Sequence, residues 1–226
     1  MTRSGRRDQA LAIVLAGLAG YVDAVGFLAT GGFFLSFMSG NSTRMGVGFG
    51  AALGGEPGDF RTSGAVAAGL IGTFVVGVVA GALAGHGAGR WRRPAVLALV
   101  AALLAGAALC GARSLTVPAT ILAVLAMGTE NAVFERDGEV SIGLTYMTGT
   151  LVKTGQGIAR ALTGGSRWGW LPHALLWAGF AAGAVAGAAL FPVFGLPTLG
   201  LAAAGFAVAA VATAAVRPVL QSAPRS

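Results

Sequence analysis

The stretch 62–89 reads TSGAVAAGLIGTFVVGVVAGALAGHGAG and contains no Asp, Glu, Lys or Arg. A bilayer core about 30 Å thick is crossed by a helix of roughly 20 apolar residues. In hydrocarbon each backbone N–H and C=O must be paired within its own segment, so an apolar run of this length forms a helix. The stretch is therefore typical of a membrane-spanning helix.

The same separation of charge continues along the chain. No charged residue occurs in 94–112 or 114–129, and His173 is the only ionisable side chain in 168–216. Of the 226 residues, 55% are hydrophobic and 10% are charged, whereas soluble domains contain about 45–50% and about 25%. This composition excludes a water-soluble globule. It predicts an all-α, polytopic bundle of membrane helices that forms one domain over residues 1–226.

Apolar runs divide the chain into eight segments. Six are uninterrupted and long enough to span: 10–28, 63–84, 94–111, 118–134, 172–191 and 197–216. Two others, 33–52 and 141–161, are interrupted at Ser39-Gly40-Asn41 and at Thr148-Gly149-Thr150. These two segments either span the membrane as well, or enter it and return as half-helices.

The basic residues favour six spans with two re-entrant segments. The net charge is +7, and the arginines lie at the ends of apolar runs, where positive charge sets the topology. With six spans only Arg61 and Arg113 lie in outside loops, whereas eight spans put Arg136 and the arginines of 90–93 outside. We therefore expect a multi-pass protein of a cell (inner) membrane with both termini in the cytoplasm.

The two halves of the chain resemble each other. GYVDAV at 20–25 aligns with GTENAV at 128–133 at an offset of 108, and FMSGN at 37–41 aligns with YMTGT at 146–150 at an offset of 109. Further on, Gly77 aligns with Gly187 at an offset of 110. We expect a duplicated unit, covering about 9–112 and about 117–217. Three spans in each unit would invert the second relative to the first, as in many secondary transporters.

The residues that could carry chemistry gather at the two interrupted segments. A Ser/Thr-Gly break followed by a helix predicts an N-cap, and the free N–H groups and partial positive charge of a helix N-terminus favour an anion. Arg44 and Lys153 are expected within the first turns, where they either complete an anion site or extend to the headgroups. The candidate substrate-binding or coupling residues are Asp23, Ser39, Gly40, Asn41, Thr43, Arg44, Glu130, Asn131, Tyr146, Thr148, Gly149, Thr150 and Lys153.

Two carboxyl groups lie in or beside expected spans. Asp23 is a functional candidate because a carboxylate inside a span is costly. It carries a coupling proton, binds a substrate group, or pairs with Arg44 to hold the interrupted segment. Glu130 and Asn131 lie at the symmetry-related position, although Glu130 could instead face water near a helix end.

Several classes of function have no support in the sequence. The sequence contains no Ser-His-Asp grouping and no phosphate-binding loop. It also has no metal-ligand spacing, because Cys110 and the two histidines lie far apart in the sequence. We expect no enzyme, no metal, no cofactor and no nucleic-acid partner, but a lipid bilayer and a small solute. Gly77, Gly81 and Gly85, spaced by four, mediate contacts in a homo-oligomer or pack internally.

Four stretches resemble the signature sequences of the YoaK-like family: AGYVDA at 19–24, FMSGNST at 37–43, Asn131-Ala132 and LTYMTGT at 144–150. The resemblance covers nearly the whole chain. It implies a small bacterial inner-membrane protein with about six spans and an unknown function, and it supplies no substrate. Members commonly have Gln where this chain has Glu130, so the resemblance assigns Glu130 no role as a proton carrier.

We expect a secondary transporter for a small anionic solute, coupled to protons through Asp23. An uncoupled, channel-like permease is one alternative, and it would not concentrate its solute. A membrane scaffold or lipid-handling protein that transports nothing is another, and it would have no polar cavity between the two Gly-containing breaks.

Overall fold

The structure is a computed structural model that describes the chain except residues 1–2, 56–59, 137–138, 141–142 and 222–226. The start of the expected segment 141–161 lies outside the described residues. The side chains of Arg61, Arg136 and Arg217 also lie outside them.

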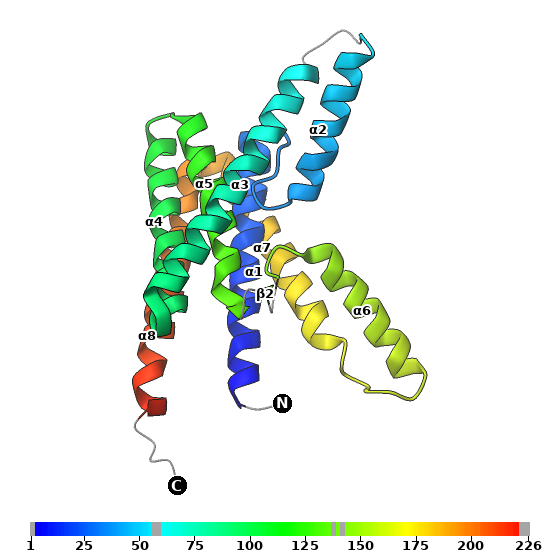
Figure 1. The fold of residues 1–226 in the computed structure, drawn as a ribbon, viewed down its shortest axis with the longest axis vertical. Coiled ribbons are helices and arrows are strands. Elements are labelled where there is room, and N and C mark those ends of the chain that lie inside the picture. The colour runs from blue at the N-terminus through cyan, green and yellow to red at the C-terminus, as the bar shows by residue number, and fades with distance from the viewer. Residues whose placement is uncertain (1–2, 56–59, 137–138, 141–142, 222–226) are drawn as a thin grey trace.

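The described residues are almost entirely helical (Figure 1). The α-helices are α1 (Arg3–Ala29), α2 (Met38–Leu53), α3 (Phe60–Ala88), α4 (Arg92–Ala112), α5 (Thr116–Glu130), α6 (Met147–Leu162), α7 (Leu171–Phe194) and α8 (Leu199–Gln221). Short 3-10 helices are η1 (Gly89–Trp91), η2 (Asn131–Phe134) and η3 (Leu196–Thr198). Strands β1 (Glu135–Arg136) and β2 (Glu139–Val140) pair antiparallel, with Glu135 opposite Val140.

In the part of the chain that the structure describes, five stretches are long and apolar enough to cross a membrane: Gly5–Ala29, Thr62–Ala112, Thr116–Phe134, Leu171–Phe194 and Leu196–Val216. The second of these contains both α3 and α4, which turn at η1, and the third joins the 15-residue α5 to η2, so six helical stretches have the length of a span. Helices α2 and α6 have 16 residues each, which extend only about 24 Å at 1.5 Å per residue. The fold is therefore a polytopic bundle of six stretches of spanning length, one of them α5 continued by η2, with two shorter helices, α2 and α6.

The chain direction alternates through the bundle. In Figure 1, α1 rises from the N-terminus, α3 descends, α4 rises, α5 descends, α7 rises and α8 descends toward the C-terminus. Both termini therefore lie at the same end of the molecule. Helices α2 and α6 start near the middle of the molecule and leave in opposite directions, α2 upward and α6 downward.

Two helix pairs, α1 with α7 and α3 with α5, pack so closely that glycines occupy their contacts. A Cβ atom on Gly20 would overlap the backbone carbonyl of Phe180, and one on Gly128 would overlap that of Phe74. Small residues allow membrane helices this close approach. Of the stripe expected at 77, 81 and 85, the first two glycines face α5 and the third faces the Arg92 side chain. The stripe therefore packs internally.

Glycines of α3 and α7 make similar contacts with α5 and α1. A Cβ on Gly77 would meet the carbonyl of Leu125, and one on Gly183 would meet that of Gly17. Leu125 and Gly17 are 108 residues apart, the offset at which the sequences of α1 and α5 align, so the contact of Gly77 matches that of Gly183. The expected alignment of Gly77 with Gly187 therefore differs from the contacts by four residues, about one helical turn.

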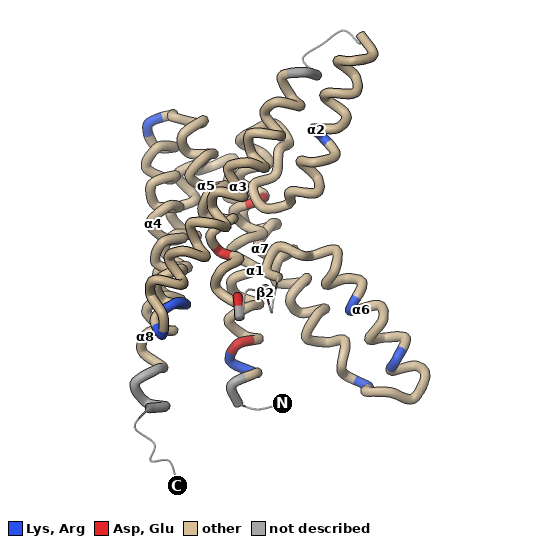
Figure 2. The backbone as a smooth tube through the Cα atoms, viewed as in Figure 1, with Lys and Arg blue, Asp and Glu red and all other residues tan. Residues whose placement is uncertain are grey.

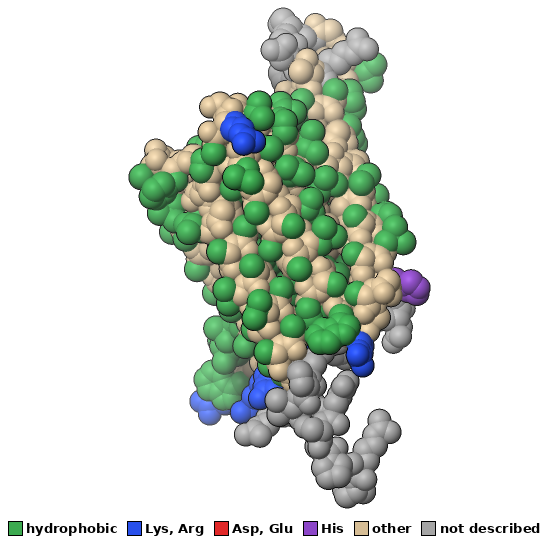
Figure 3. Space-filling view, turned by 90° about the vertical axis from the view of Figure 1, so that its left-hand side faces the viewer, with side chains coloured by type: hydrophobic (Ala, Val, Ile, Leu, Met, Phe, Trp, Pro, Cys, Tyr) green, Lys and Arg blue, Asp and Glu red, His purple; other side chains and the backbone are tan. Residues whose placement is uncertain are grey.

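The face of the bundle shown in Figure 3 is largely apolar between its two ends. Hydrophobic side chains (green) and backbone or other side chains (tan) lie there between Lys or Arg side chains at the two ends. The interior is filled by side chains such as Leu15, Leu97 and Phe206, which are fully buried. Large hydrophobic side chains also point outward, among them Val185 and Val211. An apolar exterior over an apolar core is the arrangement that a bilayer requires.

Charged residues lie chiefly at the end of the bundle that holds both termini (Figure 2). There, Arg93 forms an ion pair with Asp8 at 2.6 Å, and Arg92 forms one with Glu135. Arg113, between α4 and α5, lies at the opposite end. This distribution is the one that the sequence predicts for six spans.

Candidate functional site

Two polar side chains hold the segment that precedes α2. The Asp23 Oδ1 atom accepts the N–H groups of Leu35 and Ser36, both at 2.7 Å. The Asn41 side chain accepts the N–H of Phe34 at 3.1 Å and donates to its carbonyl at 2.7 Å. Both polar side chains are buried. These bonds pair backbone groups that a continuous helix would otherwise pair, so the segment stays out of helical conformation.

The segment before α6 has a related bond. The Thr145 hydroxyl donates to Asn131 Oδ1 at 3.3 Å, and Asn131 Nδ2 donates to the Met127 carbonyl at 3.0 Å. Asn131 aligns with Asp23, and Thr145 aligns with Ser36. A side chain near the end of a long helix thus fixes the start of a short helix in each half. Thr150, which aligns with Asn41, has a different bond, donating to the Tyr146 carbonyl at 3.1 Å.

The expected position of the breaks is wrong by a few residues. Ser39 and Thr148 are each the second residue of a helix and are not N-caps. The N-cap positions are Phe37 and Tyr146, and neither makes a side-chain capping bond. The interruption precedes the Ser/Thr-Gly blocks because distant side chains, Asp23 above all, bind the backbone there.

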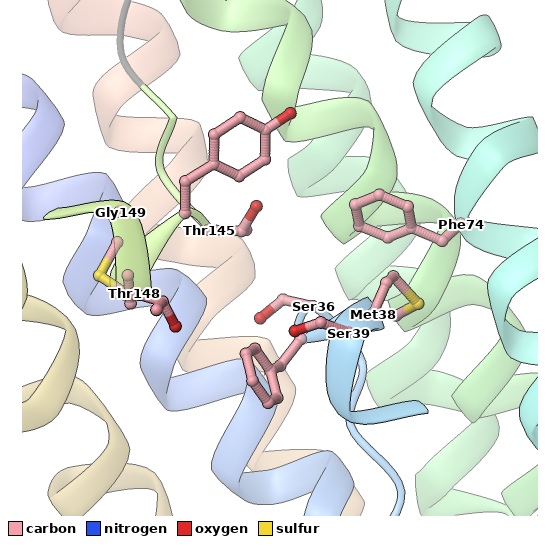
Figure 4. Close-up of a pocket in the computed structure, with 10 residues that line it drawn as sticks. Ser36, Met38, Ser39, Phe74, Thr145, Thr148 and Gly149 are labelled. Atoms are coloured by element: carbon pink, nitrogen blue, oxygen red, sulfur yellow. The ribbon is translucent and has the colours of Figure 1, made fainter. Parts of the chain in front are cut away.

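A cavity of about 310 Å³ lies between the starts of α2 and α6 (Figure 4). Ser36, Met38 and Ser39 line one wall, and Thr145 and Thr148 line the other. The remaining lining residues are Phe37, Phe74, Tyr146, Met147 and Gly149. The hydroxyl groups of both half-helix starts therefore face one shared space, within walls of aromatic rings and methionine side chains.

The starts of the two short helices differ in how their N–H groups are bonded. Among the described residues, the N–H groups of Met147, Thr148 and Gly149 in α6 form no backbone hydrogen bond. In α2 only the N–H of Ser39 lacks one, because the neighbouring N–H groups bond to the carbonyls of 36 and 37. The start of α6 therefore presents more free donors to the cavity.

The two cations do not join this cavity. Arg44 and Lys153 lie in the second turns of their helices, so the expected first-turn position is wrong. The Arg44 guanidinium lies 4.7 Å from the centre of the Phe33 ring and forms no ion pair with Asp23. Lys153 is exposed on α6. Among the described residues, no Lys or Arg lines the cavity.

The remaining predicted residues do not line the cavity. Gly40 lies against the rings of Phe34 and Phe37. The Thr43 hydroxyl donates to the Ser39 carbonyl at 3.2 Å and is exposed. Glu130 is fully buried, so it does not face water, and neither carboxyl oxygen has a hydrogen-bond partner among the described residues.

Several lining residues were not among the predicted site residues. Ser36 and Thr145 had a signal, because Leu35-Ser36 aligns with Leu144-Thr145 at the same offset of 109 as the neighbouring blocks. Phe74 had none. It reaches the cavity from the middle of α3, in a stretch that contains no charged residue.

The comparisons with known proteins agree with this architecture. A family described as "Protein of unknown function (DUF1275)" matches residues 11–212. The chain belongs to this family. It is also similar to the UPF0700 transmembrane protein RA0705 of Rhizobium meliloti (strain 1021), with 36% identity over 182 residues, which cover 80% of this chain and 75% of that protein. No solved structure is significantly similar to the chain.

The family match confirms the resemblance seen in the sequence. A transmembrane relative, six helical stretches of spanning length and an apolar exterior make this chain a multi-pass membrane protein of a family whose function is unknown.

Proposed function

We propose that the protein is a secondary transporter that carries a small anionic solute across the bacterial inner membrane through the cavity between α2 and α6. The observation that carries the proposal is the meeting of two half-helix starts at one cavity, with unpaired N–H groups beside it. Substrate sites of secondary transporters lie near the bilayer midplane, where discontinuous helices point their N-termini at anionic groups.

The electrostatics of the cavity favour a single negative charge. Each helix N-terminus has a partial positive charge equivalent to about half an elementary charge, and two such ends face this cavity. The donors nearest to it are the free N–H groups of α6 and the hydroxyls of Ser39 and Thr148. Because Lys153 and Arg44 lie elsewhere, we assign the binding of the anion to the backbone and the hydroxyl groups.

The walls of the cavity favour a small organic anion. Its volume of about 310 Å³ is at the lower end of the range for ligand pockets. Phe37, Phe74 and two methionines supply apolar surface around the polar helix starts. A short-chain carboxylate would place its charged group on the N–H groups and its apolar part on these side chains.

We further propose that the two halves form an inverted repeat that alternates the access to the cavity. The close glycine contacts of α1 with α7 and of α3 with α5 support this, because they join equivalent positions of each half. The antiparallel courses of α1 and α5 also support it (Figure 1). Movement of one half against the other would open the cavity to each side in turn.

The charge distribution supports cytoplasmic termini. The arginines at 90–93 and at 160–167 lie at the ends of helices on the side of the bundle that carries both termini. Since Lys and Arg accumulate in cytoplasmic loops, we assign that end to the cytoplasm.

The transporter is tested with purified protein in liposomes and a panel of radiolabelled monoanions: formate, acetate, propionate, lactate and benzoate. Saturable uptake of at least one, concentrated by an imposed pH gradient to a level above that in protein-free liposomes, is the expected result. Gly149→Leu, which places a side chain in the cavity, should abolish it. Gly155→Leu on the same helix is the matched control, because an added Cβ meets no atom within 4 Å at either glycine, and Gly155 does not line the cavity.

Each outcome of this test is informative. Uptake that reaches but never exceeds the outside concentration would indicate a channel-like permease. Equal uptake by both leucine variants, or wild-type uptake of all five anions that does not exceed that of protein-free liposomes, would contradict the proposal.

A further inference from the structure

Glu130 is the buried polar side chain that the architecture leaves unexplained. It lies at the end of α5, its exposed fraction is 0%, and neither carboxyl oxygen has a hydrogen-bond partner among the described residues. Buried polar groups in native proteins are almost always bonded, so each exception needs a physical reason. A carboxyl group inside a membrane span is also a functional candidate by default.

The charged groups around Glu130 do not supply a partner. Helices α1, α3 and α4 pack against α5. Their described titratable side chains, together with the one that follows η2, are Arg6, Arg7, Asp8, Tyr21, Asp23, His86, Arg92, Arg93, Cys110 and Glu135. Arg93 pairs with Asp8, Arg92 pairs with Glu135, and Asp23 binds backbone N–H groups. None of these side chains forms a hydrogen bond or an ion pair with Glu130.

An ionised Glu130 in this environment would be a buried charge without compensation. Such a charge is far more costly to bury than the neutral acid, so the group takes up a proton instead. The described conformation is therefore the one in which the carboxyl group is neutral. Ionisation requires water or a donor to reach it, and that requires the helices around α5 to move.

Glu130 is connected to the wall of the cavity through its own turn of helix. The next residue, Asn131, accepts the hydroxyl of Thr145, which lines the cavity. Gly128 packs against the backbone of Phe74, which also lines it. A shift of this turn would displace two lining residues at once, so the charge state of Glu130 and the shape of the cavity depend on each other.

We propose that Glu130 is the proton-binding site of this chain: its carboxylate takes up one proton to form the neutral acid, and releases that proton once in each transport cycle. The inference rests on the proposed transport function and deepens it by naming the coupling ion. In this proposal Glu130, and not Asp23, carries the coupling proton. Asp23 instead stabilises the segment before α2 through its two hydrogen bonds to backbone N–H groups.

Infrared difference spectroscopy of the reconstituted full-length protein tests the proton site without any substrate. The wild type should show the carbonyl stretch of a protonated carboxylic acid at neutral pH, and Glu130→Gln should lack that band. Asp23→Asn is the matched control and should keep it. A band that is unchanged in Glu130→Gln, or absent from the wild type, overturns the proposal. If Glu130→Gln is not monodisperse, Glu130→Asp replaces it, and the band should shift in frequency.

Transport measurements then test the coupling. In liposomes, Glu130→Gln should lose uptake driven by a pH gradient but keep exchange of labelled for unlabelled acetate, or for whichever panel anion the wild type carries. Unchanged pH-driven uptake would overturn the coupling role. If the wild type transports no anion, the proposed function fails, while the infrared band still decides whether Glu130 binds a proton.

Discussion

Ser39 and Thr148 line the same cavity, each from the second position of a 16-residue helix, and the two helices leave the cavity in opposite directions. Neither helix is long enough to span a bilayer. Their meeting point near the middle of the bundle is therefore the place where polar backbone is available at membrane depth. Such backbone is tolerated in membranes only when it is buried in protein or lines a cavity.

Loss of the Asp23 carboxylate should destabilise the protein. Asp23→Ala leaves the N–H groups of Leu35 and Ser36 without their acceptor, and each unpaired buried donor costs about 1–3 kcal/mol. Asp23→Asn retains an acceptor oxygen at the same place and is the control. Thermal unfolding in detergent should give a clearly lower midpoint for the alanine variant, and equal midpoints would contradict this role.

The glycines at the helix crossings should not tolerate even a methyl group. Gly128→Ala places a Cβ against the Phe74 carbonyl, and Gly20→Ala does the same against Phe180. Overpacking of this kind costs about 1–3 kcal/mol. Gly72→Ala is the control, because no atom lies within 4 Å of its Cβ. Both crossing variants should lose thermal stability to a similar extent, and a stable Gly128→Ala would show that the α3–α5 contact is looser than described.

The two basic residues of the short helices should be dispensable for binding the solute. Arg44→Ala removes a cation–π contact with Phe33, worth about 0.5–2 kcal/mol, and Lys153→Ala removes an exposed charge. Because neither side chain lines the cavity, the apparent KM for uptake should stay close to that of the wild type. A large rise in the apparent KM for either variant would show that the replaced basic residue takes part in binding the solute.

The topology predicts opposite exposure of two turns. In a Cys110→Ala background, Leu115→Cys lies in the turn between α4 and α5, and Ser166→Cys lies in the turn between α6 and α7. A membrane-impermeant thiol reagent applied to intact cells should label position 115 and leave position 166 unlabelled until the cells are permeabilised. The reverse pattern would invert the orientation, and labelling of both from one side would refute the six-span topology.

Much of this fold follows from local sequence, because hydrocarbon imposes a helix on any long apolar run. The uncharged stretch 62–89 could only form a membrane-spanning helix. The blocks around Gly40 and Gly149 identified the two segments that are not uninterrupted spanning helices. The exact start of each short helix did not follow from local sequence. It is determined by Asp23 and Asn131, which precede the short helices in sequence and form hydrogen bonds with residues 12–14 positions further along the chain.

The site was less predictable than the fold for the same reason. The direction of the Arg44 side chain depends on the Phe33 ring, which only the folded loop brings beside it. Phe74 reaches the cavity because α3 packs along both α2 and α5. The lack of a hydrogen-bond partner for the Glu130 carboxyl group, among the described residues, results from how three neighbouring helices pack around α5. The sequence around Glu130 does not predict it.

The central claim is that α2 and α6 begin at one shared cavity, and thiol cross-linking tests it most directly. In a Cys110→Ala background, a short bifunctional thiol reagent should join Ser39→Cys to Thr148→Cys within one chain, as read by mass spectrometry of the digested protein. Ser39→Cys paired with Thr163→Cys, at the far end of α6, should remain unlinked. Equal cross-linking of both pairs, or none of the first, would contradict the account.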